Sequence, residues 1–313
     1  MKYYLAPLEG VTTYVYRNAY HKHFHPMDKY FTPFIVPHKE KNFSTREKKE
    51  LSPENNQGLF VVPQLLTNNA EDFLKTAKDI TTFGYEEINL NLGCPSGTVV
   101  AKNKGSGFLA FPDELDRFLD KIFNEADFKI SIKTRIGKKQ PEEFYRLLEI
   151  YNKYPLEELI VHPRVQSDFY KNIPNWDVYE EAYKNSKSPI CYNGDLFSVN
   201  DWCRLKERFP DTETIMLGRG VIANPALVND LEQDDMLTKE QLLSFHNTIY
   251  EEYKLISSGD RNVLFKMKEL WFYMAGLFKE SEKYMKKIKK SERLKDYDKV
   301  IQLLFENCSL KEG

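Results

Sequence analysis

The sequence EINLNLGCPS, residues 87–96, ends a predicted strand in a loop with unusual chemistry. Apolar and polar residues alternate up to Leu92, which indicates a strand, and Gly93 and Pro95 then give the backbone an unusual path. The thiol of Cys94 is therefore expected on a loop at the end of a strand. A buried, inert thiol is the usual state of a lone cysteine, but this position and its polar neighbours favour a functional group.

Seven further runs of this kind form a regular series along the chain. The eight predicted strands are Tyr3–Ala6, Tyr30–Val36, Leu59–Leu66, Glu87–Leu92, Lys129–Arg135, Leu159–His162, Ile190–Asn193 and Thr214–Leu217. Helical spacing of apolar residues fills most of the intervals, at 70–81, 113–123, 141–151 and 199–208, whereas the segment 39–58 is polar and predicted to be irregular. This alternation is typical of an α/β fold of the (β/α)₈ TIM-barrel type, with a doubly wound open sheet as the alternative.

The positions of the unusual residues favour the barrel over the open sheet. Glycines, cations and amides follow or end the predicted strands, at 9–10, 64, 91–94, 133–135, 162–164, 193–195 and 218–220. In a barrel, all of these positions open onto the rim at the carboxyl ends of the strands. We therefore predict a single site at that rim.

The chain after residue 235 has no further strand pattern. Apolar residues recur there at helical spacing, at 242, 245, 249, 253 and 256. We predict a catalytic barrel over residues 1–235 and a helical domain over residues 236–313. Residues 261–300 hold 12 Lys and Arg against 6 Asp and Glu, although the whole chain has a net charge of −2. This excess predicts that the region binds nucleic-acid phosphates. A solvated helix face is the alternative.

The overall composition excludes several other classes of protein. We find no apolar run of the roughly 18 residues that cross a bilayer and no three-part signal peptide, so we predict no membrane role and a cytoplasmic location. The four cysteines lie far apart and predict neither a zinc site nor disulfides. His21, His23 and His25 would face one way in an extended segment, but their polar surroundings predict no metal site.

Charged residues accompany the ends of the fifth and sixth predicted strands. Lys133 and Arg135 occupy alternate positions, so they lie on one side of their strand. They form either a paired surface ladder or, because the strand is otherwise β-branched and buried, a cationic site for a group such as reduced flavin. His162 is either a structural histidine or, with Arg164, part of the site.

Glycine motifs follow the last two predicted strands, NGD at 193–195 and GRG at 218–220. Glycine lets the backbone approach a ligand closely, Arg219 adds a fork of donors, and barrels commonly bind a phosphate at this place. We therefore predict phosphate binding rather than two plain tight turns. The basic, glycine-rich segment 102–107 is predicted to lie near an anionic substrate.

With these motifs in order, the chain resembles the tRNA-dihydrouridine synthases, flavoenzymes that reduce particular uridines in tRNA. The resemblance runs through the whole predicted barrel. It rests on APLEGVT at 6–12, Gln64, NLGCP at 91–95, KTR at 133–135, His162, and the two glycine motifs. Asn89, Val100 and Pro163 depart from the family pattern, and this leaves open which uridine is modified.

The resemblance implies FMN as the cofactor, NADPH or NADH as the reductant and tRNA as the substrate. It implies a proton donated by Cys94 to C5 of uracil and a hydride delivered to C6. The implied flavin contacts are Pro7, Leu8, Glu9, Gln64, Asn91, Lys133, His162, Asn193, Gly194, Asp195, Gly218 and Arg219. The implied substrate contacts are Lys102, Arg135 and Arg164.

Two other functions remain as alternatives. One is an FMN-dependent barrel enzyme that acts on a free pyrimidine, similar to dihydroorotate dehydrogenase, and the basic helical region argues against it. The other is a non-catalytic RNA-binding protein, which would be colourless when purified, whereas a flavoenzyme would be yellow. No obligate protein partner is inferred.

Overall fold

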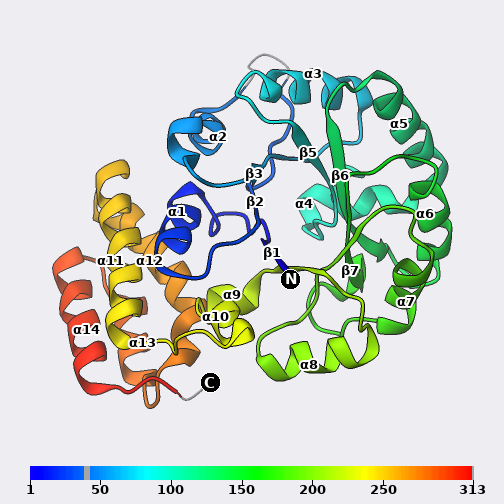
Figure 1. Cartoon of the computed structure of the whole chain (residues 1–313). Helices are drawn as coiled ribbons and strands as arrows, with labels where there is room; N and C mark the ends of the chain where they lie inside the picture. The colour runs from blue at the N-terminus through cyan, green and yellow to red at the C-terminus, as the bar shows by residue number, and fades with distance from the viewer. Residues whose placement is uncertain (39–42, 312–313) are drawn as a thin grey trace. The chain divides into compact units, whose positions relative to one another are not determined.

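The strands of the described residues, 1–38 and 43–311 of the computed structural model, lie in one sheet and pair in parallel. They are β1 (Lys2–Leu5), β2 (Lys29–Phe31), β3 (Val61–Val62), β4 (Gln64–Leu65), β5 (Glu87–Leu92), β6 (Lys129–Gly137), β7 (Leu159–Val165), β8 (Ile190–Tyr192) and β9 (Thr214–Leu217). The order β3-β2-β1-β9-β8-β7-β6-β5-β4 begins and ends with strands that only Pro63 separates in the chain. The sheet thus closes into a barrel (Figure 1), and the predicted fold class is confirmed.

Proline residues lie where two of the predicted strands are interrupted. The strand predicted at 59–66 is divided into β3 and β4 at Pro63, which has no N–H to donate to the sheet. The carbonyl oxygen of Pro63 still accepts from Asn89 N at 2.8 Å, so the barrel pairing continues across the break. The strand predicted at 30–36 ends at Phe31, two residues before Pro33.

The described chain divides into two compact units that do not follow chain order. The barrel unit contains Met1–Pro7, Asp28–Asp195 and Leu205–Leu217, and the helical unit contains Leu8–Met27, Leu196–Arg204 and Gly218–Gly313. All of the strands belong to the barrel unit. The predicted domain boundary between residues 235 and 236 stays a prediction.

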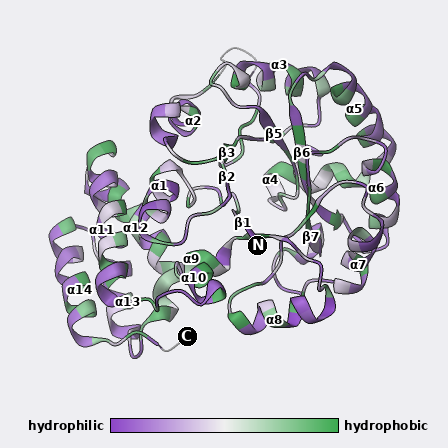
Figure 2. Cartoon of the chain, in the orientation of Figure 1, coloured by the Kyte–Doolittle hydropathy of each residue, from purple (hydrophilic) through white to green (hydrophobic). Residues whose placement is uncertain are grey.

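Amphipathic helices surround the strands of the barrel unit. They include α2 (Thr45–Leu51), α3 (Ala70–Thr81), α5 (Pro112–Glu125), α6 (Glu143–Tyr151) and α7 (Trp176–Asn185), while α8 (Val199–Arg208) contributes residues to both units. The short α4 (Gly97–Val100) has no buried residue. Asn69 caps α3 by accepting from Asp72 N at 2.8 Å, and Phe73 and Ile80 bury its apolar face. In Figure 2, α5 and α6 carry hydrophilic and hydrophobic residues along their length, as helices packed on a core do.

One of the predictions about connections is wrong. The segment 39–58, predicted to be irregular, contains α2, which begins with a capping box between Ser44 and Glu47; residues 39–42 lie outside the described residues. The segment with three alternating histidines is not extended, because α1 (Tyr14–His23) includes His21 and His23. Residues two apart on a helix point in different directions, so these histidines do not share a face.

The helical unit contains a buried polar cluster where three of its helices meet. Its helices are α1, α9 (Arg219–Ala223), α10 (Leu227–Glu232), α11 (Lys239–Ile256), α12 (Asp260–Met274), α13 (Glu282–Lys290) and α14 (Leu294–Asn307). The Tyr297 hydroxyl lies 2.7 Å from both His246 Nε2 and Trp271 Nε1. Burial lowers the pKa of His246 to about 4, so the neutral ring can accept from the hydroxyl while the indole donates to it.

Candidate active site

The main chain on both sides of the Cys94 thiol is fixed by polar side chains. Asn91 Oδ1 accepts from Gly93 N at 3.0 Å and from Cys94 N at 2.9 Å. Arg135 Nε donates to Gly93 O at 3.0 Å, and Ser106 Oγ donates to Cys94 O at 2.7 Å. The side chain itself is partly exposed. The fold therefore presents this thiol from a rigid loop at the carboxyl end of β5.

The glycine-rich segment after this loop packs closely against it. Gly105 has φ +55°, and a Cβ atom there would lie 2.9 Å from Cys94 O and 3.1 Å from Cys94 Cβ. Both the backbone angle and the space exclude a larger residue. Lys102, in the same segment, is exposed, while Gly105 and Ser106 are buried against the Cys94 loop.

A chain of side-chain amides connects three strands to this loop. Gln64 Nε2 on β4 donates to Asn89 Oδ1 at 2.7 Å, and Gln64 Oε1 accepts from Asn91 Nδ2 at 2.7 Å. Asn89 Nδ2 in turn donates to Ser131 Oγ on β6 at 2.9 Å. Because each member is neutral, the buried network carries no charge to desolvate. It ends at the N–H of Cys94 through Asn91.

Lys133 places a positive charge at the same rim. Its ammonium donates to Asn193 Oδ1 at 2.6 Å, and Asn193 Nδ2 donates to Met216 O at 2.8 Å. Desolvation, together with the charge of Arg135, lowers the pKa of Lys133 to about 8. The neutral amide therefore does not compensate for the removal of water from this cation, and an anion beside it would stabilise it.

Three N–H groups of Arg135 donate to main-chain oxygens of the protein. NH1 donates to Val165 O at 2.9 Å and NH2 donates to Phe169 O at 2.7 Å, in addition to the bond from Nε to Gly93 O. The guanidinium carbon lies 5.4 Å from the centre of the Tyr170 ring. This side chain thus joins the Cys94 loop to the segment after β7, and its predicted contact with substrate stays a prediction.

Arg164 forms a bidentate ion pair across the next strands. Its NH1 donates to Asp195 Oδ1 at 2.9 Å and its NH2 donates to Asp195 Oδ2 at 2.5 Å. The same NH1 lies 3.0 Å from His162 Nε2, and the His162 ring stacks on Tyr170 with 6.0 Å between ring centres. Three predicted site residues are thereby brought together on β7 and directly after β8.

The predicted site residues fall into both units. Those in the barrel unit are Pro7, Gln64, Asn91, Cys94, Lys102, Lys133, Arg135, His162, Arg164, Asn193, Gly194 and Asp195; those in the helical unit are Leu8, Glu9, Gly218 and Arg219. A Cβ atom on Gly194 would lie 2.1 Å from the Tyr192 hydroxyl, so glycine is required there. In the helical unit, the Arg219 guanidinium lies 5.4 Å from the centre of the Phe197 ring.

Sequence reasoning missed Ser106, Gln166 and Tyr170. Gln166 Nε2 donates to Pro95 O at 3.3 Å, and Tyr170 lies against both His162 and Arg135. Ser106 could have been found, because it lies within the glycine-rich segment that the sequence singled out. Gln166 and Tyr170 belong to an irregular segment and carry no local signal.

The part of the chain that the structure describes contains neither a candidate metal site nor a candidate membrane helix. Within that part, no group of three or more His, Cys, Asp and Glu is placed to hold a metal ion. His23 Nε2 lies 2.8 Å from Thr248 Oγ1, and His25 Nδ1 lies 3.2 Å from Asp234 Oδ2. No described helix is long and apolar enough to cross a membrane.

Some known proteins are similar to this chain in sequence, and others are similar to it in fold. A family model for dihydrouridine synthase matches residues 4–310. A probable tRNA-dihydrouridine synthase of Staphylococcus aureus is 28% identical over 262 residues, covering 80% of this chain and 77% of that relative. The probable tRNA-dihydrouridine synthase 2 of Bacillus subtilis is 26% identical over 260 residues, covering 80% and 78%. The old yellow enzyme from Trypanosoma cruzi superimposes with a TM-score of 0.53 at 10% identity, covering 78% of this chain and 91% of that structure.

Proposed function

The chain belongs to the dihydrouridine synthase family, which makes it a flavin-dependent oxidoreductase, and from this we propose that it reduces the C5–C6 bond of specific uridines in tRNA. The observation that carries the proposal is the rigid loop that presents the partly exposed Cys94 thiol. Its main chain is held on both sides, and Lys133 supplies a cation at the same rim.

We propose FMN as the flavin and NADPH or NADH as the reductant. When bound, FMN supplies the hydride for C6 of uracil. Lys133 fits a reduced, anionic flavin, because such an anion would offset the desolvation that lowers its pKa to about 8. The further contacts proposed in the barrel unit are Pro7, Gln64, Asn91, His162, Asn193, Gly194 and Asp195. The flavin contacts of Leu8, Glu9, Gly218 and Arg219 stay predictions.

Cys94 is the proposed proton donor. As the S–H bond breaks, a C–H bond forms at C5, and the sulfur is left as a thiolate that takes a proton from water before the next turnover. The working form is therefore the neutral thiol, in contrast to cysteines that act as nucleophiles. Ser106 and Asn91 take no proton in this step; they hold the loop so that the thiol stays at the reacting carbon.

The substrate must reach this thiol as an extruded base. A uridine inside folded tRNA has to leave its stack before an enzyme can act on its ring. We propose that Lys102, which is exposed, contacts the substrate, and that Arg135 and Arg164 position the site, since their donors are already bound to protein atoms. Residues 236–313 are the proposed tRNA-binding domain, and a cytoplasmic location stays a prediction.

The reaction can be tested on tRNA that lacks dihydrouridine. We expect mass spectrometry of its nucleosides to show dihydrouridine after incubation with the protein, FMN and NADPH, and we expect Cys94→Ala to abolish this product. Cys203→Ala, at an exposed cysteine outside the site, is the matched control and should be fully active. Absence of the product on every tRNA tested would refute the proposal and favour reduction of a free pyrimidine.

A further inference from the structure

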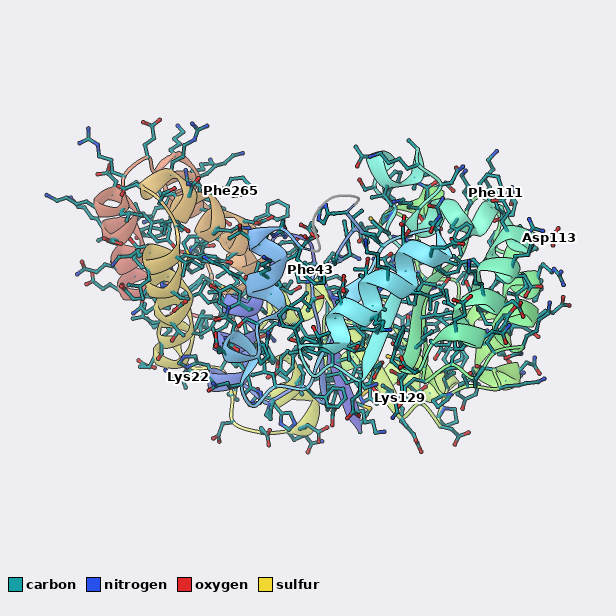
Figure 3. All side chains as sticks on the ribbon, turned by 90° about the horizontal axis from the view of Figure 1, so that it is seen from above. Lys22, Phe43, Phe111, Asp113, Lys129 and Phe265 are labelled. Carbon is teal, nitrogen blue, oxygen red and sulfur yellow. The ribbon has the colours of Figure 1, made fainter. Side chains whose placement is uncertain are left out.

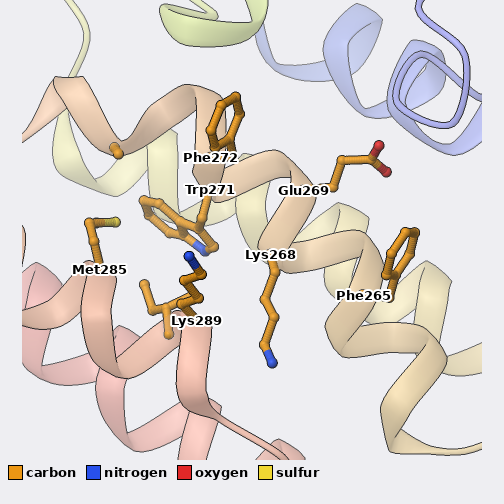
Figure 4. A pocket seen from close by; sticks show the side chains of 9 residues that line it. Phe265, Lys268, Glu269, Trp271, Phe272, Met285 and Lys289 are labelled. Carbon is orange, nitrogen blue, oxygen red and sulfur yellow. The ribbon is translucent and has the colours of Figure 1, made fainter.

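The helical unit contains a hollow of about 480 Å³ between α12 and α13 (Figure 4). Its lining is mostly apolar: Phe265, Trp271, Phe272, Ala275, Met285 and Ile288, together with Lys268, Glu269 and Lys289. A second hollow of about 610 Å³ adjoins it and shares Phe265 and Lys268. The two form one groove with an apolar half and a polar half.

The apolar side chains of this groove divide into a buried and an exposed group. Trp271 and Ile288 are each 2% exposed, whereas Phe265 is 65% exposed and Phe272 is 78% exposed. Phe265 and Phe272 are seven residues apart, two turns along the same face of α12. Figure 3 labels Phe265 on the helical unit. Single exposed apolar residues are normal, but two that flank an apolar hollow form a patch suited to a flat ring.

The charged residues around this groove indicate what kind of ligand it can bind. Helix α13 carries five lysines and one glutamate, and its Lys289 is exposed on the lining of the hollow. Lys268 Nζ donates to Ser291 O at 2.5 Å, which places a second ammonium where α13 ends. The carboxylate of Glu269 lies 3.6 Å from Lys266, so its charge is partly compensated. An occupant that combines a flat apolar ring with adjoining negative charge matches this surface.

We propose that this groove binds an unpaired nucleotide of RNA, whose base stacks on Phe272 and Phe265 while the lysines of α13 contact the adjoining phosphates. Aromatic stacking holds unpaired bases of any sequence, and lysines supply the sequence-independent contact with the backbone. The choice of RNA rests on the proposed function. The site is formed entirely by residues of the helical unit and shares no residue with the Cys94 loop.

Binding of two short probes separates stacking from charge. One is an oligouridylate, and the other is an abasic ribose-phosphate chain of the same length and charge. We expect fluorescence anisotropy with the full chain to show tighter binding of the oligouridylate. Phe272→Ala should weaken that binding about fivefold or more and leave the abasic chain unaffected, whereas Phe272→Trp should retain it.

Two controls accompany this measurement. Tyr145→Ala removes an aromatic side chain that is 47% exposed on α6 of the barrel unit, and it should change neither affinity. Lys289→Ala should weaken both probes alike and reduce the dependence of affinity on salt. Equal affinity for the two probes, or an unchanged affinity in Phe272→Ala, would overturn the inference.

The failure of this inference can be distinguished from the failure of the proposed function. If the protein makes dihydrouridine in tRNA but Phe272→Ala binds oligouridylate as the parent chain does, only the stacking site is refuted. If base-dependent binding is found but no tRNA gains dihydrouridine, the stacking site stands and the reaction is refuted. Circular dichroism of the variants checks that these exposed positions leave the fold intact.

Discussion

At the scale of single residues, Arg135 shows how a cation predicted to bind substrate also holds the site together. Its guanidinium donates to three main-chain oxygens, those of Gly93, Val165 and Phe169. Lysine keeps the charge but cannot reproduce this planar fork, and the buried Val165 carbonyl left without a donor costs about 1–3 kcal/mol. We expect Arg135→Lys to lower the free energy of unfolding by at least about 1 kcal/mol and to slow dihydrouridine formation.

Urea unfolding and the tRNA assay measure these two effects. Arg146→Lys is the matched control, because Arg146 is exposed on α6 and donates to Glu149 at 3.0 Å. A pair of this kind contributes little, so that variant should behave as the parent chain does. If Arg135→Lys unfolded and reacted as the parent chain does, the positioning role of Arg135 would be excluded.

Gly105 is the second residue on which the Cys94 loop depends. An alanine there would incur the cost of a left-handed backbone and would also press its Cβ against Cys94 O. Gly58→Ala separates these two effects, since Gly58 has φ +78° and no atom within 4 Å of an added Cβ. We expect both variants to lose about 1–2 kcal/mol of stability from the backbone, and only Gly105→Ala to lose most of its activity on tRNA. Equal activity in the two would show that the loop tolerates displacement.

At the scale of elements, the strands could be predicted because their signals are local. The strand predicted at 87–92 and the helices predicted at 70–81 and 199–208 have the predicted bounds, since alternation and helical spacing decide them within one segment. The barrel could be predicted from the number of alternating strand and helix segments and from the polar residues at the strand ends. Helix α2 escaped prediction because its surface is polar and its capping box carries the signal instead.

The partners of the site residues could not be read from the sequence. The sequence placed Lys133, Asn193, Arg164 and Asp195 at the rim, but the pairs they form join residues 60 and 31 positions apart in the chain. The register between strands decides which of these donors bind protein atoms. This register cannot be read from any single segment of the sequence. For the same reason the groove between α12 and α13 became visible only in three dimensions.

At the scale of the whole molecule, the amino-terminal end of the barrel carries a buried charged cluster that affects stability. Glu158 accepts from the Tyr4 hydroxyl at 3.0 Å and lies 3.8 Å from Lys29, which pairs with Glu87 at 2.8 Å. Burial raises the pKa of Glu158 from 4.5 to about 7 against the opposing effect of Lys29. The folded state therefore holds this proton more tightly than the unfolded state does.

This cluster should make the unfolding free energy depend on pH in a defined window. Between pH 4.5 and about 7 the unfolded chain releases the Glu158 proton first, so the contribution of Glu158 falls as pH rises and is fully lost above about 7. Glu158→Gln cannot titrate, so its stability relative to the parent chain should increase by roughly 2–3 kcal/mol across this window. Urea unfolding at several pH values measures this difference. Glu157→Gln, at a glutamate that pairs with Lys129 at 3.2 Å, is the matched control for the change from a carboxylate to an amide. A flat difference for Glu158→Gln would mean that Lys29 offsets the desolvation of this carboxylate and that the pKa of Glu158 is not raised by folding.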